Sequence, residues 1–220
     1  MAAVDDGDFW RDPVFVPCYI DLSGFAVSLI PRPRDAAFNL LQLGAGSGRL
    51  AAAIAAAFPK ARLTLMEPDG RLLARARERL GEDAARCEFI ETDWMEEPLP
   101  GGQDVISTML ALESLGAEDR AELYADMLGA LVRYGMVVLA ECVTGGSPGI
   151  DYAYATVWRE QVAAAGGDAG LIERRANELA ILPLPTMEEH VAALTKAGFA
   201  EASCWYKNMG FTLVSGVKAL

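Results

Sequence analysis

The chain has 220 residues, of which 31 are acidic and 19 are basic, and its net charge is −12. A negative field of this size repels phosphate backbones, so the composition argues against nucleic acid as a partner. Hydrophobic residues make up 52% of the chain, yet no apolar run approaches the roughly 20 residues of a membrane span. The length suits one α/β domain with a full core and is short for two.

The N-terminal 30 residues contain several aspartates and lack the basic region with which a signal peptide begins. Four cysteines are far apart and form no C-x-x-C pair: Cys18, Cys87, Cys142 and Cys204. We therefore expect reduced, mostly buried thiols and no metal site. Together these features predict a cytoplasmic protein without a membrane partner.

Residues 1–37 are rich in acidic side chains and prolines around an apolar centre. This composition predicts a short N-terminal arm or lid over the domain. One interpretation places Tyr19 or Phe25 against a ligand, and Tyr19 is a candidate catalytic residue. The alternative is a helix that covers one edge of a sheet.

The stretch 40–50 joins an apolar run to three glycines at alternate positions, and an alanine-rich, helix-like segment follows. A strand that turns through glycines into a helix presents free backbone N–H groups to a ligand. A dinucleotide loop of the form G-x-G-x-x-G would need glycine at position 49, where this chain has Arg49. The predicted cofactor-binding loop consists of Gly44, Ala45, Gly46, Ser47 and Gly48.

The segment 61–66 is predicted to be the second strand, and Glu67 and Pro68 follow it. In a doubly wound sheet, a carboxylate at this end lies beside the nucleoside and can accept both ribose hydroxyls. We assign that role to Glu67. The alternative, an acid that favours the start of the next helix, fits Asp69 better. That next helix is expected over residues 71–80.

The third strand is predicted at 87–90, and Asp93 and Trp94 come soon after it. An acid at this place can accept the adenine amino group, and an aromatic ring beside it can stack on the base. A surface turn would explain the same residues. The glycine loop, Glu67 and Asp93 occur together at the expected spacing, and this coincidence favours a cofactor site.

The fourth strand is predicted at 104–109, which brings Met109 and the loop 110–115 to the same crevice. In this loop Glu113 is a candidate base or a binder of a cationic substrate. A helix-capping role for Glu113 is equally open.

A helix over 121–133 and a fifth strand over 136–141 are expected next, followed by a long insertion from residue 143 to 184. An insertion at this place usually builds the roof over the substrate in such a fold. The predicted substrate-binding residues are Tyr152, Trp158, Arg159 and Arg175.

Thr186 and Glu189 predict a capping box at the start of a helix that ends at Gly198. His190, the single histidine, lies at the edge of its apolar stripe and is interpreted as structural. The segments 200–207 and 211–217 then read as an antiparallel hairpin.

Taken together, the glycine loop, Glu67-Pro68, Thr92-Asp93-Trp94 and the C-terminal hairpin resemble the class I S-adenosylmethionine-dependent methyltransferases. The resemblance covers residues 38–220. It implies a doubly wound, Rossmann-like seven-stranded sheet with helices on both faces. It also implies S-adenosylmethionine as the cofactor and in-line transfer of a methyl group to a small-molecule acceptor.

The segments 196–199 and 204–211 are similar to a narrower branch that includes the carboxy-S-adenosylmethionine synthases. In that branch an arginine holds the added carboxylate, and the corresponding residue is Arg175. The loop 110–115 departs from the synthase pattern, so we rank a methyltransferase with a small acceptor first, including one that bears a carboxylate. A synthase-like enzyme, a non-catalytic cofactor-binding partner and a homodimer remain open.

Overall fold

The computed structural model describes residue 8 and residues 11–219. The strands are β1 (Asn39–Leu43), β2 (Arg62–Glu67), β3 (Cys87–Glu91), β4 (Gln103–Met109), β5 (Leu131–Cys142), β6 (Phe199–Asn208) and β7 (Phe211–Lys218). The helices are α1 (Tyr19–Leu29), α2 (Arg49–Ala57), α3 (Gly70–Leu80), the 3₁₀ helix η2 (Gly81–Arg86), α4 (Ala117–Ala130), α5 (Pro148–Ala164), α6 (Ala169–Ile181) and α7 (Met187–Ala197).

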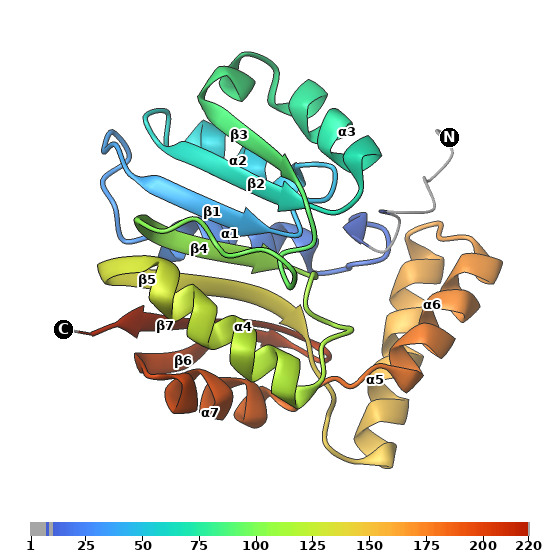
Figure 1. The fold of residues 1–220 in the computed structure, drawn as a ribbon. Coiled ribbons are helices and arrows are strands. Elements are labelled where there is room, and N and C mark those ends of the chain that lie inside the picture. Colours follow the sequence, from blue (N-terminus) through green and yellow to red (C-terminus); the bar gives the residue numbers. More distant parts are fainter. Residues whose placement is uncertain (1–7, 9–10, 220) are drawn as a thin grey trace.

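The strands form one seven-stranded sheet in the order β3-β2-β1-β4-β5-β7-β6 (Figure 1). The pairs from β3 to β5 are parallel, whereas β7 is antiparallel to both of its neighbours. The strand order reverses between β1 and β4, so the topological switch point lies at the carboxyl ends of these two strands. The predicted fold class, with its C-terminal antiparallel hairpin, is confirmed.

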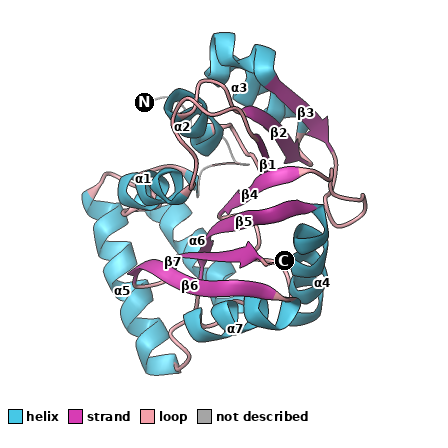
Figure 2. Cartoon of the chain, turned by 90° about the vertical axis from the view of Figure 1, so that its left-hand side faces the viewer, coloured by secondary structure: helices cyan, strands magenta, loops and turns pink. Residues whose placement is uncertain are grey.

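Helices cover both faces of the sheet. The helices α1, α2 and α3 pack against one face, and α4 and α7 pack against the other. The helices α5 and α6 form a separate pair that follows β5 and lies beyond the carboxyl ends of the parallel strands (Figures 1 and 2). This placement puts the insertion beside the switch point.

Local signals in the sequence explain most helix starts. Asp69 caps α3 by accepting the N–H of Arg71 at 2.9 Å, as the alternative interpretation of this acid predicted. The capping box predicted from Thr186 and Glu189 is present at the start of α7.

The end of α4 differs from the prediction. We expected a helix as far as residue 133, but α4 ends at Ala130 and β5 begins at Leu131. Leu131 is buried and pairs with Gln103 of β4, so tertiary packing overrides the local helical pattern. Tyr134 has a φ of 61°, and the pairing of β5 resumes regularly at Met136.

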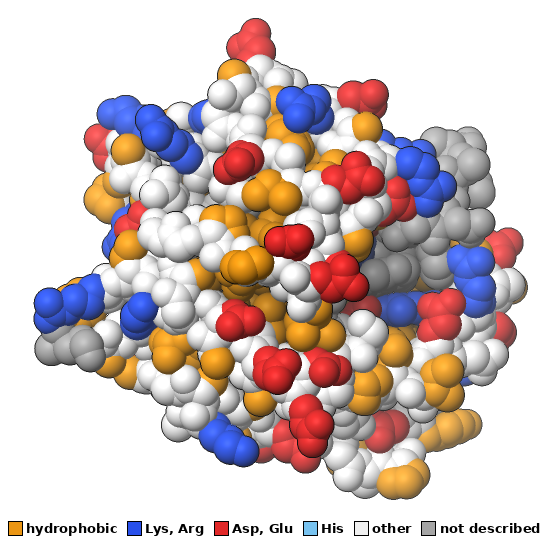
Figure 3. Space-filling model, viewed as in Figure 1, with side chains coloured by type: hydrophobic (Ala, Val, Ile, Leu, Met, Phe, Trp, Pro, Cys, Tyr) orange, Lys and Arg blue, Asp and Glu red, His pale blue; other side chains and the backbone are white. Residues whose placement is uncertain are grey.

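The surface carries the acidic excess of the composition. Figure 3 shows Asp and Glu side chains spread over the face seen in Figure 1, with Lys and Arg mainly toward its margins. Among the described helices, none is long and apolar enough to cross a membrane.

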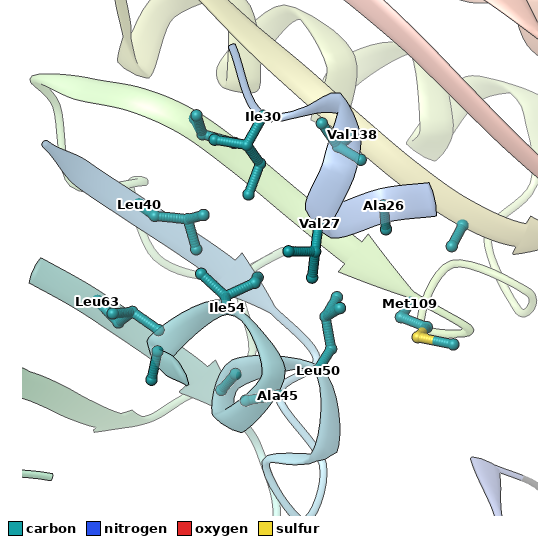
Figure 4. Close-up of a cluster of buried hydrophobic side chains, with 14 of the residues drawn as sticks. Ala26, Val27, Ile30, Leu40, Ala45, Leu50, Ile54, Leu63, Met109 and Val138 are labelled. Carbon is teal, nitrogen blue, oxygen red and sulfur yellow. The ribbon is translucent and has the colours of Figure 1, made fainter. Parts of the chain in front are cut away.

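The core lies on both faces of the central strands. Leu40 of β1 contributes to the cluster under α1 and α2, whereas Leu41 and Leu43 contribute to the cluster under α4 and α7. Val27 and Ile54 approach Leu40 from the two helices (Figure 4). After the exposed Asn39, β1 is buried on both faces, and its sequence from Leu40 to Leu43 is apolar except at Gln42.

Candidate functional site

The turn after β1 has a backbone that glycine adopts most easily. Gly44, Gly46 and Gly48 have φ angles of 63°, 54° and 76°. Close packing gives a second reason, because a Cβ on Gly48 would lie 2.8 Å from the Cα of Ala76 in α3. A Cβ on Gly44 would lie 2.4 Å from the Cβ of Ala111. The glycines therefore let α3 and the loop after β4 approach the turn closely.

Glu67 stands at the carboxyl end of β2, and only 4% of its surface is exposed. Its Oε2 accepts the N–H of Gly46 at 2.9 Å, and its Oε1 accepts the N–H of Asp69 at 3.3 Å. The carboxylate thus faces the glycine turn, and its contact with ribose hydroxyls stays a prediction.

Several other predicted site residues, among them the candidate catalytic Tyr19, surround the same turn. Ala45, Ser47, Met109 and Tyr19 line one small crevice together with Gly44. The Trp94 ring also reaches the turn, because its Cη2 would lie 3.3 Å from a Cβ on Gly44.

Pro68 and Asp93 are exposed, and Asp93 uses its carboxylate to accept the N–H of Met95 at 3.0 Å. The structure therefore shows Asp93 in a local turn, and its contact with adenine stays a prediction.

The N-terminal segment, predicted as an arm or lid, reaches into the crevice through Asp8 and Arg11, two residues that the sequence did not assign to the site. Arg11 donates from Nε to the carbonyl of Leu110 at 3.0 Å, and its Nη1 lies 3.7 Å from Glu67 Oε2. Asp8 lies 3.6 Å from the same Nη1, and its Oδ1 would stand 2.9 Å from a Cβ on Gly46. With these side chains in place, the crevice has a volume of about 20 Å³.

Of the buried polar atoms beside the turn that have no hydrogen-bond partner in the described part of the chain, three belong to neutral side chains: Gln42 Oε1, Ser47 Oγ and Trp94 Nε1. A buried polar atom without a partner costs roughly 1–3 kcal/mol, so these atoms are suited to a polar ligand. With Glu67 and the glycine turn, they fit a cofactor that has an amino-acid end, a ribose and a ring. The small volume requires the side chains of Asp8 and Arg11 to move before such a ligand enters.

The loop after β4 is held by Glu141, a second residue that the sequence analysis missed. Glu141 is buried in β5 and accepts the N–H groups of Ala111 and Leu112, each at 3.1 Å, and the hydroxyl of Thr108. Burial raises the pKa of Glu141 to about 7. The available signal was a glutamate inside the otherwise apolar run 136–142.

Glu113 and Arg175 form a buried ion pair. Arg175 Nη2 lies 2.9 Å from Glu113 Oε1, and both side chains are less than a tenth exposed, at 7% and 6%. The neighbouring Cys142 thiol has its pKa raised by burial and by the Glu113 carboxylate. Arg175 is buried on α6, and its partner there is Glu113 rather than a ligand carboxylate. The carboxylate-holding role inferred from the synthase branch stays a prediction.

A second, larger cavity of about 400 Å³ lies between α5, α6 and the β6–β7 turn. Its wall includes two of the predicted substrate residues, Tyr152 and Trp158. A third predicted residue, Arg159, instead pairs with Glu173 of α6 at 3.0 Å.

The crevice and the cavity are neighbours along the chain. Cys18 lines the cavity, and the next residue, Tyr19, lines the glycine crevice. Burial raises the pKa of the Tyr19 phenol to about 12, so this side chain keeps its proton at neutral pH.

Comparison with known proteins agrees with this geometry. Residues 40–135 match a family described as a methyltransferase domain. This part of the chain carries the sequence pattern of a methyltransferase domain. Among proteins of curated function, none matches the chain.

Solved structures share the fold. The apo S-adenosylmethionine-dependent methyltransferase SibL superimposes with a TM-score of 0.64 at 18% identity over 94% of this chain. PigF with SAH superimposes with a TM-score of 0.66 at 21% identity over 96% of this chain. Human N-acetylserotonin methyltransferase in complex with SAM superimposes with a TM-score of 0.63 at 15% identity over 96% of this chain. The chain spans 58%, 57% and 58% of these three proteins, respectively, which is less than two thirds of their length.

Proposed function

We propose that this chain is an S-adenosylmethionine-dependent methyltransferase that acts on a small molecule. The observation that carries the proposal is the position of the glycine crevice, with Glu67 facing it, beside the cavity under α5 and α6. A cofactor in the crevice and an acceptor in the cavity would meet near Cys18 and Tyr19.

In this proposal, each residue around the turn contacts a different part of the cofactor. Glu67 accepts hydrogen bonds from the ribose hydroxyls, and Trp94 borders the adenine. Gly44, Gly46 and Ser47 face the amino-acid end, and Pro68, Asp93 and Met109 complete the contact. When bound, S-adenosylmethionine supplies a methyl group activated on a sulfonium.

The chain's own contribution to the rate is mainly alignment. Holding an acceptor in line with the methyl group can supply on the order of 7–11 kcal/mol. The two candidate bases are poorly prepared to remove a proton, because Tyr19 has a raised pKa and Glu113 is paired with Arg175. An acceptor that is already nucleophilic at neutral pH therefore fits this site best.

A labelling experiment tests the proposal. The protein is incubated with S-adenosylmethionine that carries a deuterated methyl group and with a panel of small amines, phenols, thiols and acids, and product masses are read. We expect one acceptor class to gain the labelled methyl group. A carboxylated cofactor would instead favour the synthase-like enzyme, and binding without any product would favour a non-catalytic partner.

A further inference from the structure

The cavity between α5 and α6 carries information about the acceptor, and the inference that follows rests on the function proposed above. Its volume of about 400 Å³ falls within the range of about 300–1,000 Å³ that is usual for small-molecule sites. Apolar and aromatic side chains form most of the wall, including Tyr154, Trp158 and Phe211. The indole N–H of Trp158 donates to the carbonyl of Phe15 at 2.8 Å, which fixes the orientation of this ring.

The described wall of the cavity contributes no positive charge. Among the described residues that line it there is no lysine or arginine. Arg175 is paired with Glu113, and Arg159 is paired with Glu173. Lys207 lies 5.9 Å from the centre of the Tyr154 ring but is exposed and outside the lining. A buried carboxylate on the acceptor would therefore lose its hydration without gaining a counter-ion.

The charged group in the described lining is the carboxylate of Asp151. It accepts the hydroxyl of Thr144 at 2.6 Å and the N–H of Gly145 at 2.7 Å. Both donors are neutral, and the described lining holds no lysine or arginine that could pair with this carboxylate. Aromatic faces and one carboxylate together form an environment that favours a positive charge.

We propose that the cavity takes a planar, uncharged ring compound whose nitrogen lone pair accepts the methyl group. The nitrogen forms a new bond to the methyl carbon as the bond from that carbon to the donor sulfur breaks. The positive charge passes from sulfur to nitrogen, and no proton is transferred. This chemistry needs no general base, and the cavity that holds the charged product has Asp151 and aromatic rings in its wall.

Three probes with the same two-ring skeleton test the class of ligand. Quinoline is neutral, N-methylquinolinium is the cationic product of its methylation, and 2-naphthoate is an anion. Binding to the whole chain is measured by calorimetry in the presence of S-adenosylhomocysteine. We expect both quinoline compounds to bind about tenfold or more tightly than 2-naphthoate, because the anion is buried unpaired. Equal or tighter binding of 2-naphthoate would overturn the proposal.

Asp151→Asn isolates the role of charge, because the amide oxygen can still accept from Thr144 and Gly145. We expect this variant to bind N-methylquinolinium about fivefold to tenfold more weakly and to bind quinoline as tightly as wild type does, since only the cation interacts with the lost charge. An equal effect on both probes, or no effect on the cation, would contradict this role for Asp151.

Ala155→Phe and Ala180→Phe fill the cavity from α5 and from the exposed end of α6, and Ala153→Phe is the matched control on an exposed position of α5 outside the lining. We expect the first two variants to abolish quinoline binding while S-adenosylhomocysteine binding and the control stay unchanged. Quinoline binding that survives both filling variants would place the probe elsewhere and refute the inference.

The same measurements separate this inference from the proposed function. If S-adenosylhomocysteine binds but quinoline does not, the acceptor class is wrong and the cofactor assignment stands. If quinoline binds in the cavity but S-adenosylhomocysteine does not, the methyltransferase proposal fails and the ligand preference of the cavity stands.

Discussion

Glu141 and His190 are both buried, and burial favours the neutral form of each. The pKa of Glu141 is raised to about 7, whereas that of His190 is lowered to about 3. His190 stacks on the Tyr124 ring at 5.9 Å, and its two ring nitrogens have no hydrogen-bond partner in the part of the chain that is described. These contacts support the structural interpretation of the single histidine.

The lowered pKa of the buried His190 should make the folded protein lose stability in acid. The unfolded chain takes up a proton on this side chain below about pH 6.5, whereas the folded chain resists protonation down to about pH 3. Stability should therefore fall as the pH drops through this window. We expect His190→Phe to remove this loss, so that its stability relative to wild type rises by roughly 2 kcal/mol between pH 7 and pH 5. Urea unfolding at both values measures the difference, and parallel pH profiles would contradict the assignment.

The residues of the glycine turn were predictable because each obeys a local rule. Glycines at alternate positions after an apolar run indicate a turn with left-handed backbone, which the structure has. Glu67 follows the next strand at the spacing expected for a nucleoside-binding acid. Arg11 was not predictable in this way. Its contact with Leu110 joins residues 99 positions apart, and no pattern near Arg11 indicates it.

At the scale of elements, the N-terminal segment, the loop after β4 and α6 are joined by charged side chains. Arg11 holds the segment against the crevice, and Asp12 accepts from Arg49 at the start of α2 at 2.7 Å. Arg175 ties α6 to Glu113 across 62 positions of sequence. The sequence predicted the seven strands and most helices outside the 143–184 insertion, with the end of α4 misplaced. It gave no partner for these charges because their partners are distant in the chain.

The filled crevice predicts that Arg11 competes with the cofactor. Arg11→Ala removes the hydrogen bond to the Leu110 carbonyl and the positive charge beside Glu67. Opening the crevice should therefore cost less free energy. We expect S-adenosylhomocysteine to bind about threefold to tenfold more tightly, the equivalent of one hydrogen bond. Calorimetry measures the change, and Arg62→Ala, an exposed residue at the opposite end of β2, is the control. Weaker binding in Arg11→Ala would mean that Arg11 contacts the bound cofactor.

The pair between Glu113 and Arg175 predicts a non-additive effect on stability. Arg175→Leu leaves the Glu113 carboxylate buried without its partner, which should cost about 3–5 kcal/mol of unfolding free energy. The double variant with Glu113→Leu should recover most of this loss, because no isolated charge remains. Urea unfolding of the single and double variants measures both effects. If Arg175→Leu costs less than about 1 kcal/mol, the pair does not hold α6 in place.

At the scale of the whole molecule, the strand order places every feature of the site at one edge of the sheet. The glycine turn, Glu67 and the loop after β4 follow neighbouring parallel strands, and α5 and α6 follow β5 at the same edge. This arrangement was predictable from the alternation of strands and helices. The boundary at Leu131 was not, because its strand pairing overrides a local pattern that favours helix.

The net charge of −12 predicts that the protein does not bind nucleic acid. The arginines of α3 lie on a helix whose apolar side is buried through Leu72, Leu73 and Ala76, so they belong to a solvated face. A mobility-shift titration with bulk tRNA at physiological salt should show no saturable complex. A complex at micromolar protein would reveal a basic patch strong enough to offset the overall charge.

The measurement that tests the central claim most directly is calorimetric titration of the whole chain with S-adenosylhomocysteine and, separately, with NAD. We predict that S-adenosylhomocysteine binds and NAD does not. Glu67→Ala should lose roughly 1.5–3 kcal/mol of binding free energy, because the ribose hydroxyls lose their charged acceptor. Glu88→Ala, an exposed residue on β3, should bind like wild type. Binding of NAD, or unchanged binding of S-adenosylhomocysteine in Glu67→Ala, would contradict the account.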